Sequence, residues 1–267
     1  MRHRLSALVF AAALAAGCTV HGPDTCGQIR PSARTGTVAV LVPTTNQVYL
    51  YGGQTAQSLD AADLWRYDFV GGCANGGWTQ LHLETMPRDI GAYAAAFDSK
   101  RNRILYLSFD SQTVWALDSD GLKWSQLRPT GALTAASADA GAVYDEEHDR
   151  LLVGSRQLRF GASDDGEWSA LPLQANMKLP VIGPASAVDP VRRAVYSLDD
   201  QGVLTVYTFL TDTQQPVALA GDAFGTVVGA RMGWDSQAKR MVVFAPDGAS
   251  PEPAAKSPCV LRTEKVY

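Results

Sequence analysis

The sequence is poor in the residues from which most metal centres and many active sites are built. It contains four histidines and four cysteines among 267 residues. His82 and His148 are not spaced as a pair of metal ligands, and the chain carries no P-loop, dinucleotide-binding glycine motif or Gly-x-Ser-x-Gly motif. We therefore expect no metal ion and no cofactor, and no residue stands out as catalytic.

Basic charge is scarce as well. Charged residues make up 19% of the chain, the formal net charge is −4, and no run of lysine and arginine occurs beyond the first residues. Proteins that bind nucleic acids need a positive surface to attract the phosphates. We therefore expect no nucleic-acid partner.

Long hydrophobic runs are missing too. The apolar core from Leu5 to Ala16 is shorter than the about 20 residues that span a bilayer as a helix. It follows the basic start Met1 to Arg4 and ends in small residues before Cys18, an order typical of a secretory signal. The same residues resemble the lipobox of bacterial lipoproteins, although Ala15 stands where that family usually has leucine.

This resemblance implies cleavage before Cys18 and a lipid on that cysteine. Residues 18–25 would then form a tether that holds the protein at a membrane. The expected location is the bacterial cell envelope, on its periplasmic side or its outer surface. A plain signal peptide over residues 1–17 with an unmodified Cys18 is the alternative.

What the chain has in abundance is one repeated pattern. An apolar residue and an aspartate are followed, after four residues, by a basic residue and an apolar strand. Copies begin at Phe97-Asp98, Tyr144-Asp145, Val188-Asp189 (where Arg193 is one residue out of step) and Trp234-Asp235, and a degenerate copy spans Leu41 to Val48. These five copies recur at about 45 to 50 residues, a period typical of repeat folds.

Each copy is expected to fold as four short antiparallel strands. In the copy from Gly91 to Leu127, the run Ile104 to Leu107 is apolar and bounded by polar residues, as in a buried strand. The turn before this strand is Ser99 to Asn102, and Asp98 is well placed to hydrogen-bond its backbone. One such sheet cannot bury its own faces, so the copies are expected to pack against one another.

The first copy resembles a Kelch repeat. Val48 to Gly53 combines an apolar run with a double glycine, and Tyr67 and Trp78 follow at spaced positions. The later copies are degenerate, and the resemblance covers residues 26–267. It implies an all-β fold, a single monomeric β-propeller of about five four-stranded blades.

The last copy lacks a fourth strand, and the start of the chain offers one. Cys26 to Pro31 resembles Trp124 to Pro129 residue for residue, with Cys26 at the tryptophan position. An N-terminal strand is therefore expected to complete the last blade and close the ring, which leaves no exposed edge. Six blades are the alternative, with a further blade within Pro172 to Pro184.

Three cysteines follow Cys18, namely Cys26, Cys73 and Cys259. In an exported protein two of them are expected to form a disulfide. Cys26–Cys73 is favoured over Cys26–Cys259, because Cys26 and Cys259 would begin antiparallel strands at opposite ends. Either pair would tie the ring closed.

One face of the expected propeller is the candidate binding face. In a Kelch blade, the loop between the second and third strands and the segment that leads into the first strand share a face. Two such loops are long here, Gln54 to Ala62 and Pro246 to Pro258, and loops carry function more often than scaffolds do. The candidate binding residues on this face are Arg88, Tyr93, Asp139 and Arg231.

The sequence thus predicts a lipid-anchored, extracytoplasmic protein that binds or scaffolds a protein or glycan partner. One alternative is a carbohydrate-acting enzyme with its site at the mouth of the central propeller channel. Asp139 would then supply a carboxylate to that site. Another is a structural part of a larger envelope assembly.

Overall fold

The computed structural model describes residues 29–58, 61–69, 76–88, 93–133, 140–161, 163–172, 174, 181–218, 229–235, 238–244 and 261–263. Every regular element in these residues is a β-strand. No helix in this part of the chain is long and apolar enough to cross a membrane. The chain divides into two units, Thr19–Leu171 and Pro172–Tyr267 together with Met1–Cys18.

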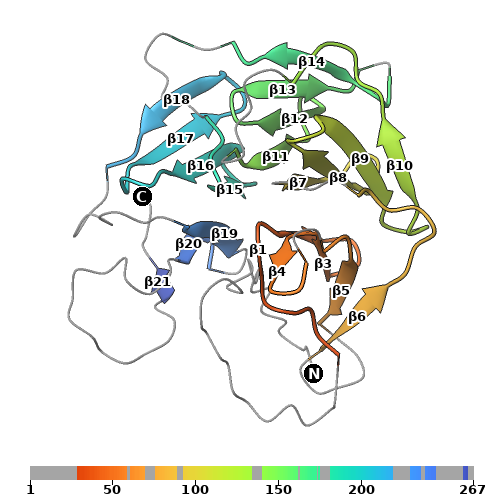
Figure 1. Cartoon of the computed structure of the whole chain (residues 1–267). Coiled ribbons are helices and arrows are strands. Elements are labelled where there is room, and N and C mark those ends of the chain that lie inside the picture. Colours follow the sequence, from red (N-terminus) through yellow and green to blue (C-terminus); the bar gives the residue numbers. More distant parts are fainter. Residues whose placement is uncertain are drawn as a thin grey trace, which may run out of the picture. The chain divides into compact units, whose positions relative to one another are not determined.

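The unit Thr19–Leu171 contains three four-stranded antiparallel sheets, each with its strands in chain order. The first comprises β2 (Val38–Val42), β3 (Gln47–Tyr51), β5 (Leu64–Asp68) and β6 (Gly77–Leu81). The second comprises β7 (Tyr93–Asp98), β8 (Arg103–Ser108), β9 (Thr113–Asp118) and β10 (Trp124–Leu127). The third comprises β11 (Ala142–Asp145), β12 (Arg150–Val153), β13 (Arg156–Arg159) and β14 (Glu167–Ala170), and a two-stranded sheet joins β1 (Arg34–Thr35) to β4 (Gln54–Thr55). The first strand β7 lies beside both β2 and β11, and Figure 1 shows the second and third sheets together.

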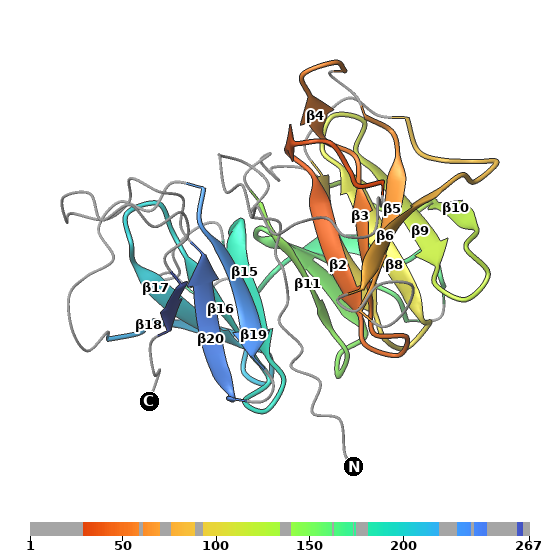
Figure 2. The ribbon, with the colours of Figure 1, turned by 90° about the horizontal axis from the view of Figure 1, so that it is seen from below.

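The unit Pro172–Tyr267 repeats the arrangement with two sheets. The fourth sheet comprises β15 (Ala185–Asp189), β16 (Ala194–Leu198), β17 (Leu204–Thr208) and β18 (Thr213–Pro216). The fifth has three strands, β19 (Arg231–Asp235), β20 (Arg240–Phe244) and β21 (Leu261–Thr263). β15 lies beside β19, as Figure 2 shows.

The prediction of an all-β, propeller-like fold built from four-stranded antiparallel sheets is confirmed, but the predicted blade count is wrong. The described residues form four four-stranded blades, not five or six. The fifth copy is a three-stranded sheet, and the described residues of 172–184 form no strand that could begin a sixth blade.

The predicted N-terminal closing strand is not found among the described residues. Ile29 to Pro31 belong to no strand, and Cys26 lies outside the description. The first described strand, β1, pairs with β4 beside the first sheet. The likeness between Cys26–Pro31 and Trp124–Pro129 thus has no counterpart among the described strands, and residues 26–28 lie outside the described part of the chain.

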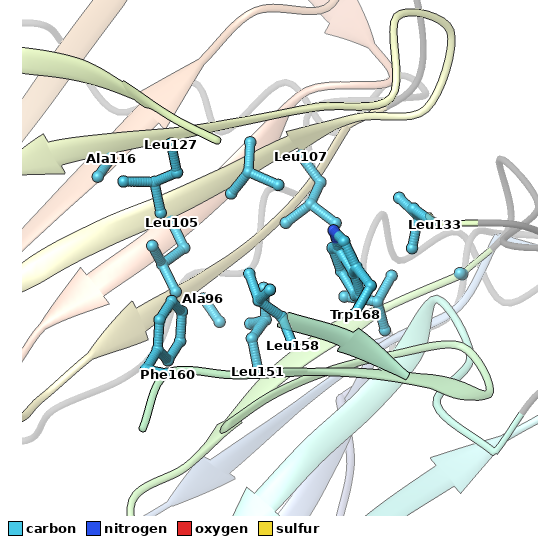
Figure 3. Packing of buried hydrophobic residues seen from close by; sticks show 13 residues of the cluster. Ala96, Leu105, Leu107, Ala116, Leu127, Leu133, Leu151, Leu158, Phe160 and Trp168 are labelled. Atoms are coloured by element: carbon cyan, nitrogen blue, oxygen red, sulfur yellow. The ribbon is translucent and has the colours of Figure 1, made fainter. Parts of the chain in front are cut away.

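Neighbouring sheets pack face to face through apolar side chains. Between the second and third sheets, Leu105 and Leu107 meet Leu151, Leu158 and the ring of Trp168 (Figure 3). These leucines are fully buried, and each contributes about 1.5–3 kcal/mol relative to an exposed position. The core between the first and second sheets includes Trp124, so Trp124 and Trp168, each in the fourth strand of its sheet, both pack between neighbouring sheets.

The repeated Asp–Arg pattern forms the same turn in every full copy. The aspartate ends the first strand and accepts a hydrogen bond from the backbone N–H three residues later, as in Arg101 to Asp98 at 3.2 Å. The residue before the second strand has a positive φ in all five copies: Asn46, Asn102, Asp149, Arg193 and Lys239. In the fourth copy, Arg193 takes this position and Arg192 pairs with Asp189, which explains why the sequence pattern is shifted by one residue.

Candidate functional site

Each sheet has two chemically different ends. At one end, which we call the turn end, the chain connects the first strand to the second and the third strand to the fourth. The loop end has the connection from the second to the third strand and the segment that leads into the first. In the unit Thr19–Leu171 the turn ends lie together, since Thr44 donates to Asn102 at 3.1 Å and Ser99 donates to Glu146 at 2.9 Å. The three loop ends therefore point the same way.

At the loop end of the first sheet, the N-terminal segment is held against the long loop. Arg34 lies opposite Thr55 and Thr35 lies opposite Gln54 in the β1–β4 pair. Gly53 has a φ of +98°, and a Cβ at this position would lie 2.7 Å from the carbonyl oxygen of Thr35. Only glycine fits this close approach. We use the name N-terminal clasp for β1, β4 and the ion pair between Arg34 and Asp63.

Arg34 is the centre of the clasp. Its side chain is 1% exposed, its guanidinium pairs with both carboxylate oxygens of Asp63, and it donates to the carbonyl oxygen of Gly52 at 3.0 Å. The indole N–H of Trp65 donates to Asp63 at 2.6 Å. A buried charge is tolerated only when it is paired and its hydrogen bonds are satisfied. The clasp is therefore a specific interaction that fixes the course of the loop.

The clasp supports a short exposed stretch. The Thr55 hydroxyl accepts hydrogen bonds from the N–H groups of Gln57 and Ser58, at 3.2 and 3.0 Å. Gln54, Ala56 and Gln57 are exposed. A loop that is already ordered loses less conformational entropy when it binds, so this stretch suits recognition.

The loop ends of the second and third sheets are simpler. Residues 109–112 and 154–155 make short connections, of which Asp110, Ser111 and Gln112 are exposed. Arg156 in the third sheet donates to the carbonyl oxygen of Ala132 at 2.7 Å, and its Nε is buried without a hydrogen-bond partner in the described structure. This end thus offers separate cationic, anionic and amide groups for hydrogen bonding.

Two of the predicted binding residues lie at this loop end. Arg88 is exposed and follows Pro87, whose carbonyl oxygen accepts a hydrogen bond from the Tyr51 hydroxyl at the end of β3. Tyr93 is the first residue of β7 and pairs with Ser108, which places its backbone at the loop end of the second sheet. A binding role for Arg88 and Tyr93 stays a prediction.

The other predicted residues lie elsewhere. Arg231 begins β19 in the unit Pro172–Tyr267, where it is exposed and donates to the carbonyl oxygen of Ala230 at 2.8 Å. The remaining predicted positions lie outside the described residues: Asp139, Pro246 to Pro258, Cys18, Cys26, Cys73 and Cys259. The lipid and the disulfide therefore stay predictions.

The turn end carries the densest charge network. Arg101 donates to both oxygens of Asp149 at 2.7 and 2.9 Å, and to Asp164 at 2.7 Å. Its guanidinium also lies 3.3 Å from Asp98 and 4.8 Å from the ring centroid of Phe160. One arginine of the second sheet thus binds two carboxylates of the third.

This network shifts the pKa of its members. The hydrogen bond from Arg101 lowers the pKa of Asp149 to about 2, and a hydrogen bond from the Tyr144 hydroxyl at 2.6 Å adds to the effect. Burial raises the pKa of Tyr144, and its bond to Asp149 raises it further. At neutral pH the Asp149 carboxylate is therefore charged and the Tyr144 phenol is protonated. In these states Asp149 accepts the hydrogen bonds from both Arg101 and Tyr144.

Metal chemistry finds no support among the described residues. No group of three or more histidine, cysteine, aspartate or glutamate side chains is placed there to hold a metal ion. The Nδ1 atom of His148 lies 2.8 Å from Asp145, which also accepts from Arg150 at 2.8 Å. His148 thus takes the turn position that Arg101 and Arg192 take in other copies, and its role is structural.

Sequence reasoning missed Arg34 and Asp63, which position the long loop. The signal that could have indicated them is the double glycine, because Gly52 and Gly53 mark a place where another backbone approaches closely. The strands of the clasp are two residues long, too short to show an alternating pattern.

Comparisons with known proteins agree with the fold. The chain matches no protein-family model and no curated protein. Among solved structures, 505 chains match it. One is a structural genomics protein of unknown function from Bacteroides thetaiotaomicron VPI-5482, with a TM-score of 0.51 and 14% sequence identity. The match covers 78% of this chain and 55% of that one, so this chain spans little more than half of its length. At this identity the likeness concerns the propeller-like fold and not an activity.

Proposed function

We propose that this protein is a lipid-anchored, extracytoplasmic binding or scaffold protein whose loop end takes up a protein or glycan partner. The anchor is supported by the sequence before Cys18, with its basic start, short apolar core and small residues. The protein then works in the bacterial cell envelope, on the periplasmic side or at the outer surface.

The observation that carries the binding role is the N-terminal clasp. A buried, doubly paired arginine is expensive to desolvate, and here Arg34 and Asp63 order a loop rather than fill the core. The result is the exposed stretch around Gln57, held in one shape on a rigid sheet. Binding residues are typically found on loops that a scaffold positions in this way.

We further propose that the sheets are degenerate Kelch-type blades. The double glycine supports this, since Gly52 and Gly53 have φ values of 71° and 98° where the chain leaves β3. In the second sheet Phe109 takes the place after β8, and the loop there is a short turn without glycine.

The anchor is tested by replacing the cysteine. The wild-type protein is expressed in a bacterial host and its N-terminal peptide is analysed by mass spectrometry, beside Cys18→Ser. The acyl mass is expected on Cys18 of the wild type, and Cys18→Ser is expected to leave the membrane fraction. An unmodified N-terminal peptide in the wild type would contradict the anchor and leave the binding role untouched.

The binding face is tested by surface charge. Partners are crosslinked in the native envelope and identified, and each one is then titrated against the purified protein. We expect Ala56→Arg with Gln57→Arg to weaken binding by about tenfold or more, as for contacts in the centre of an interface. The matched control is Thr44→Arg with Thr45→Arg at the turn end, which adds the same two positive charges at exposed positions and should bind like the wild type. Equal affinity of both double variants would refute the face.

A further inference from the structure

Two junctions between sheets in this molecule are copies of each other. One joins the second and third sheets, and the other joins the fourth and fifth sheets within the unit Pro172–Tyr267. Counted from the turn aspartates, the buried residues occupy the same positions in both. The matching pairs are Ala96 and Ala187, Leu105 and Tyr196, Leu107 and Leu198, Leu151 and Met241, and Val153 and Val243.

The turn ends of the two junctions differ in charge. In the first, Arg101 is the third residue after its aspartate, and it donates to Asp149, the fourth residue after the aspartate of the next sheet. In the second junction the same two positions are held by Arg192 and Lys239. The carboxylate that receives the arginine in one junction is therefore replaced by an ammonium group in the other.

The Arg192 side chain is directed toward the fifth sheet, which carries Lys239. Arg192 donates to the buried Asp189 at 2.9 Å, yet 51% of its side chain is exposed. It also interacts with Tyr196, a residue of the core that faces β19 and β20. The guanidinium therefore lies on the side of the fourth sheet that meets the fifth. Lys239 is exposed, and no carboxylate of the described residues pairs with it.

We propose that this junction binds a phosphoryl group or a similar oxyanion between Arg192 and Lys239, where the Asp149 carboxylate lies in the first junction. The planar guanidinium donates two parallel hydrogen bonds to such a group, and the ammonium adds a point charge from the neighbouring turn.

The surrounding charges favour an anion. Asp189 is fully buried and its charge is balanced by Arg192, and Asp235 of the fifth sheet lies 3.3 Å from Arg240. Asp212 accepts from the Tyr207 hydroxyl in the adjacent turn. With Arg193 and Lys239 in addition, the described residues of this turn end carry four cationic side chains against these three carboxylates. The inference is independent of the lipid anchor and of the partner at the loop end.

The anion has two possible sources, inorganic phosphate or the headgroup of a phospholipid. The turns that flank the site end in exposed apolar residues, Val191 at 68% and Leu210 at 67% exposure. A backbone hydrogen bond from Phe209 to Arg193 at 3.1 Å joins these two turns. A headgroup would bring these side chains against the membrane surface, whereas free phosphate would not involve them.

The test rebuilds the first junction in the second. Lys239→Asp places a carboxylate opposite Arg192, and aspartate tolerates the positive φ of 50° at this position. The matched control is Lys100→Asp, which makes the same change of net charge at an exposed turn of the second sheet. Binding of inorganic phosphate to the full chain is measured by calorimetry, and thermal unfolding is compared in phosphate and chloride at equal ionic strength.

We expect the wild type and Lys100→Asp to bind phosphate and to unfold at higher temperature in it. We expect Lys239→Asp to bind about tenfold more weakly or worse, and to be more stable than the wild type in chloride. Failure of the wild type to distinguish phosphate from chloride would overturn the proposal. So would equal phosphate binding by Lys239→Asp.

The source is settled with the Cys18→Ser protein, which carries no acyl anchor, and vesicles of phosphatidylcholine with and without phosphatidylglycerol. If the site binds a headgroup, the protein should float with the anionic vesicles. Both Lys239→Asp and Val191→Ser should reduce this flotation. Binding of free phosphate without such flotation supports the site and assigns it to a soluble anion. Flotation that Lys239→Asp leaves unchanged would rule out a lipid headgroup at this site.

Discussion

Replacing Arg101 by methionine should loosen the junction between the second and third sheets. Methionine keeps much of the apolar length that lies over Phe160 but removes the side-chain hydrogen bonds to Asp98, Asp149 and Asp164, while the backbone N–H still donates to Asp98. Because Asp149 is partly buried, it would be left without its main partner rather than returned fully to water. The cost therefore exceeds that of an ordinary surface ion pair.

The magnitude follows from the pKa of Asp149. Its value falls from the usual 3.8 to about 2, and the hydrogen bond from Arg101 is the largest cause. A carboxylate stabilised to this extent in the folded state contributes about 2 kcal/mol at neutral pH. Loss of the contact with Phe160 adds about 0.5 kcal/mol. We expect Arg101→Met to lose about 2–3 kcal/mol, or roughly 5–10 °C in Tm for a domain of this size.

The assay is urea unfolding as a function of pH. Since the pKa of Asp149 is lowered on folding, its contribution is present above about pH 4 and disappears as the pH falls through about 2. The difference between wild type and Arg101→Met should shrink over that interval. A matched control, Lys100→Met, removes the neighbouring exposed charge and should cost little. A loss below about 0.5 kcal/mol for Arg101→Met, or one independent of acid pH, would refute the reasoning.

Three further substitutions should separate other features of the fold, each measured by urea unfolding. Tyr106→Phe removes a buried hydroxyl that has no hydrogen-bond partner in the described structure, so stability should be unchanged or rise by about 1 kcal/mol; a clear loss would reveal a partner. Gly131→Ala should lose about 1–3 kcal/mol, because φ is +75° and the new Cβ would lie 2.6 Å from the Trp168 carbonyl oxygen; a neutral result would contradict this close approach. Arg34→Met removes the ion pair of Asp63, which keeps the hydrogen bond from Trp65, and should cost about 3 kcal/mol, with faster proteolysis of the loop after β4; an intact loop would show that the clasp is dispensable.

The fold was largely readable from the sequence because its signals are local and repeated. In four of the five copies an aspartate ends the first strand and a basic residue follows the turn, and the structure shows why. The buried carboxylate of Asp98 both receives the turn N–H and pairs with Arg103 at 2.9 Å. Such a turn is specified by a few adjacent residues, and each copy repeats them.

The features that the sequence did not predict depend on distant partners. The edge of the fifth sheet and the position of β1 are set by pairing between segments far apart in the chain, which a local pattern does not encode. The clasp joins Arg34 to Asp63, and the turn network joins Arg101 to Asp164. Each of these residues is an ordinary charged residue in its own sequence context.

The most direct measurement of the central claim is site-specific photocrosslinking in the native envelope. A photoreactive residue is placed at Gln57 of the loop end or at Lys100 of the turn end, two exposed positions of the same unit. The account predicts a defined protein or glycan adduct from position 57, lost when Ala56→Arg is added, and none from position 100. Adducts from position 100 alone, or equally from both, would contradict a binding face at the loop end.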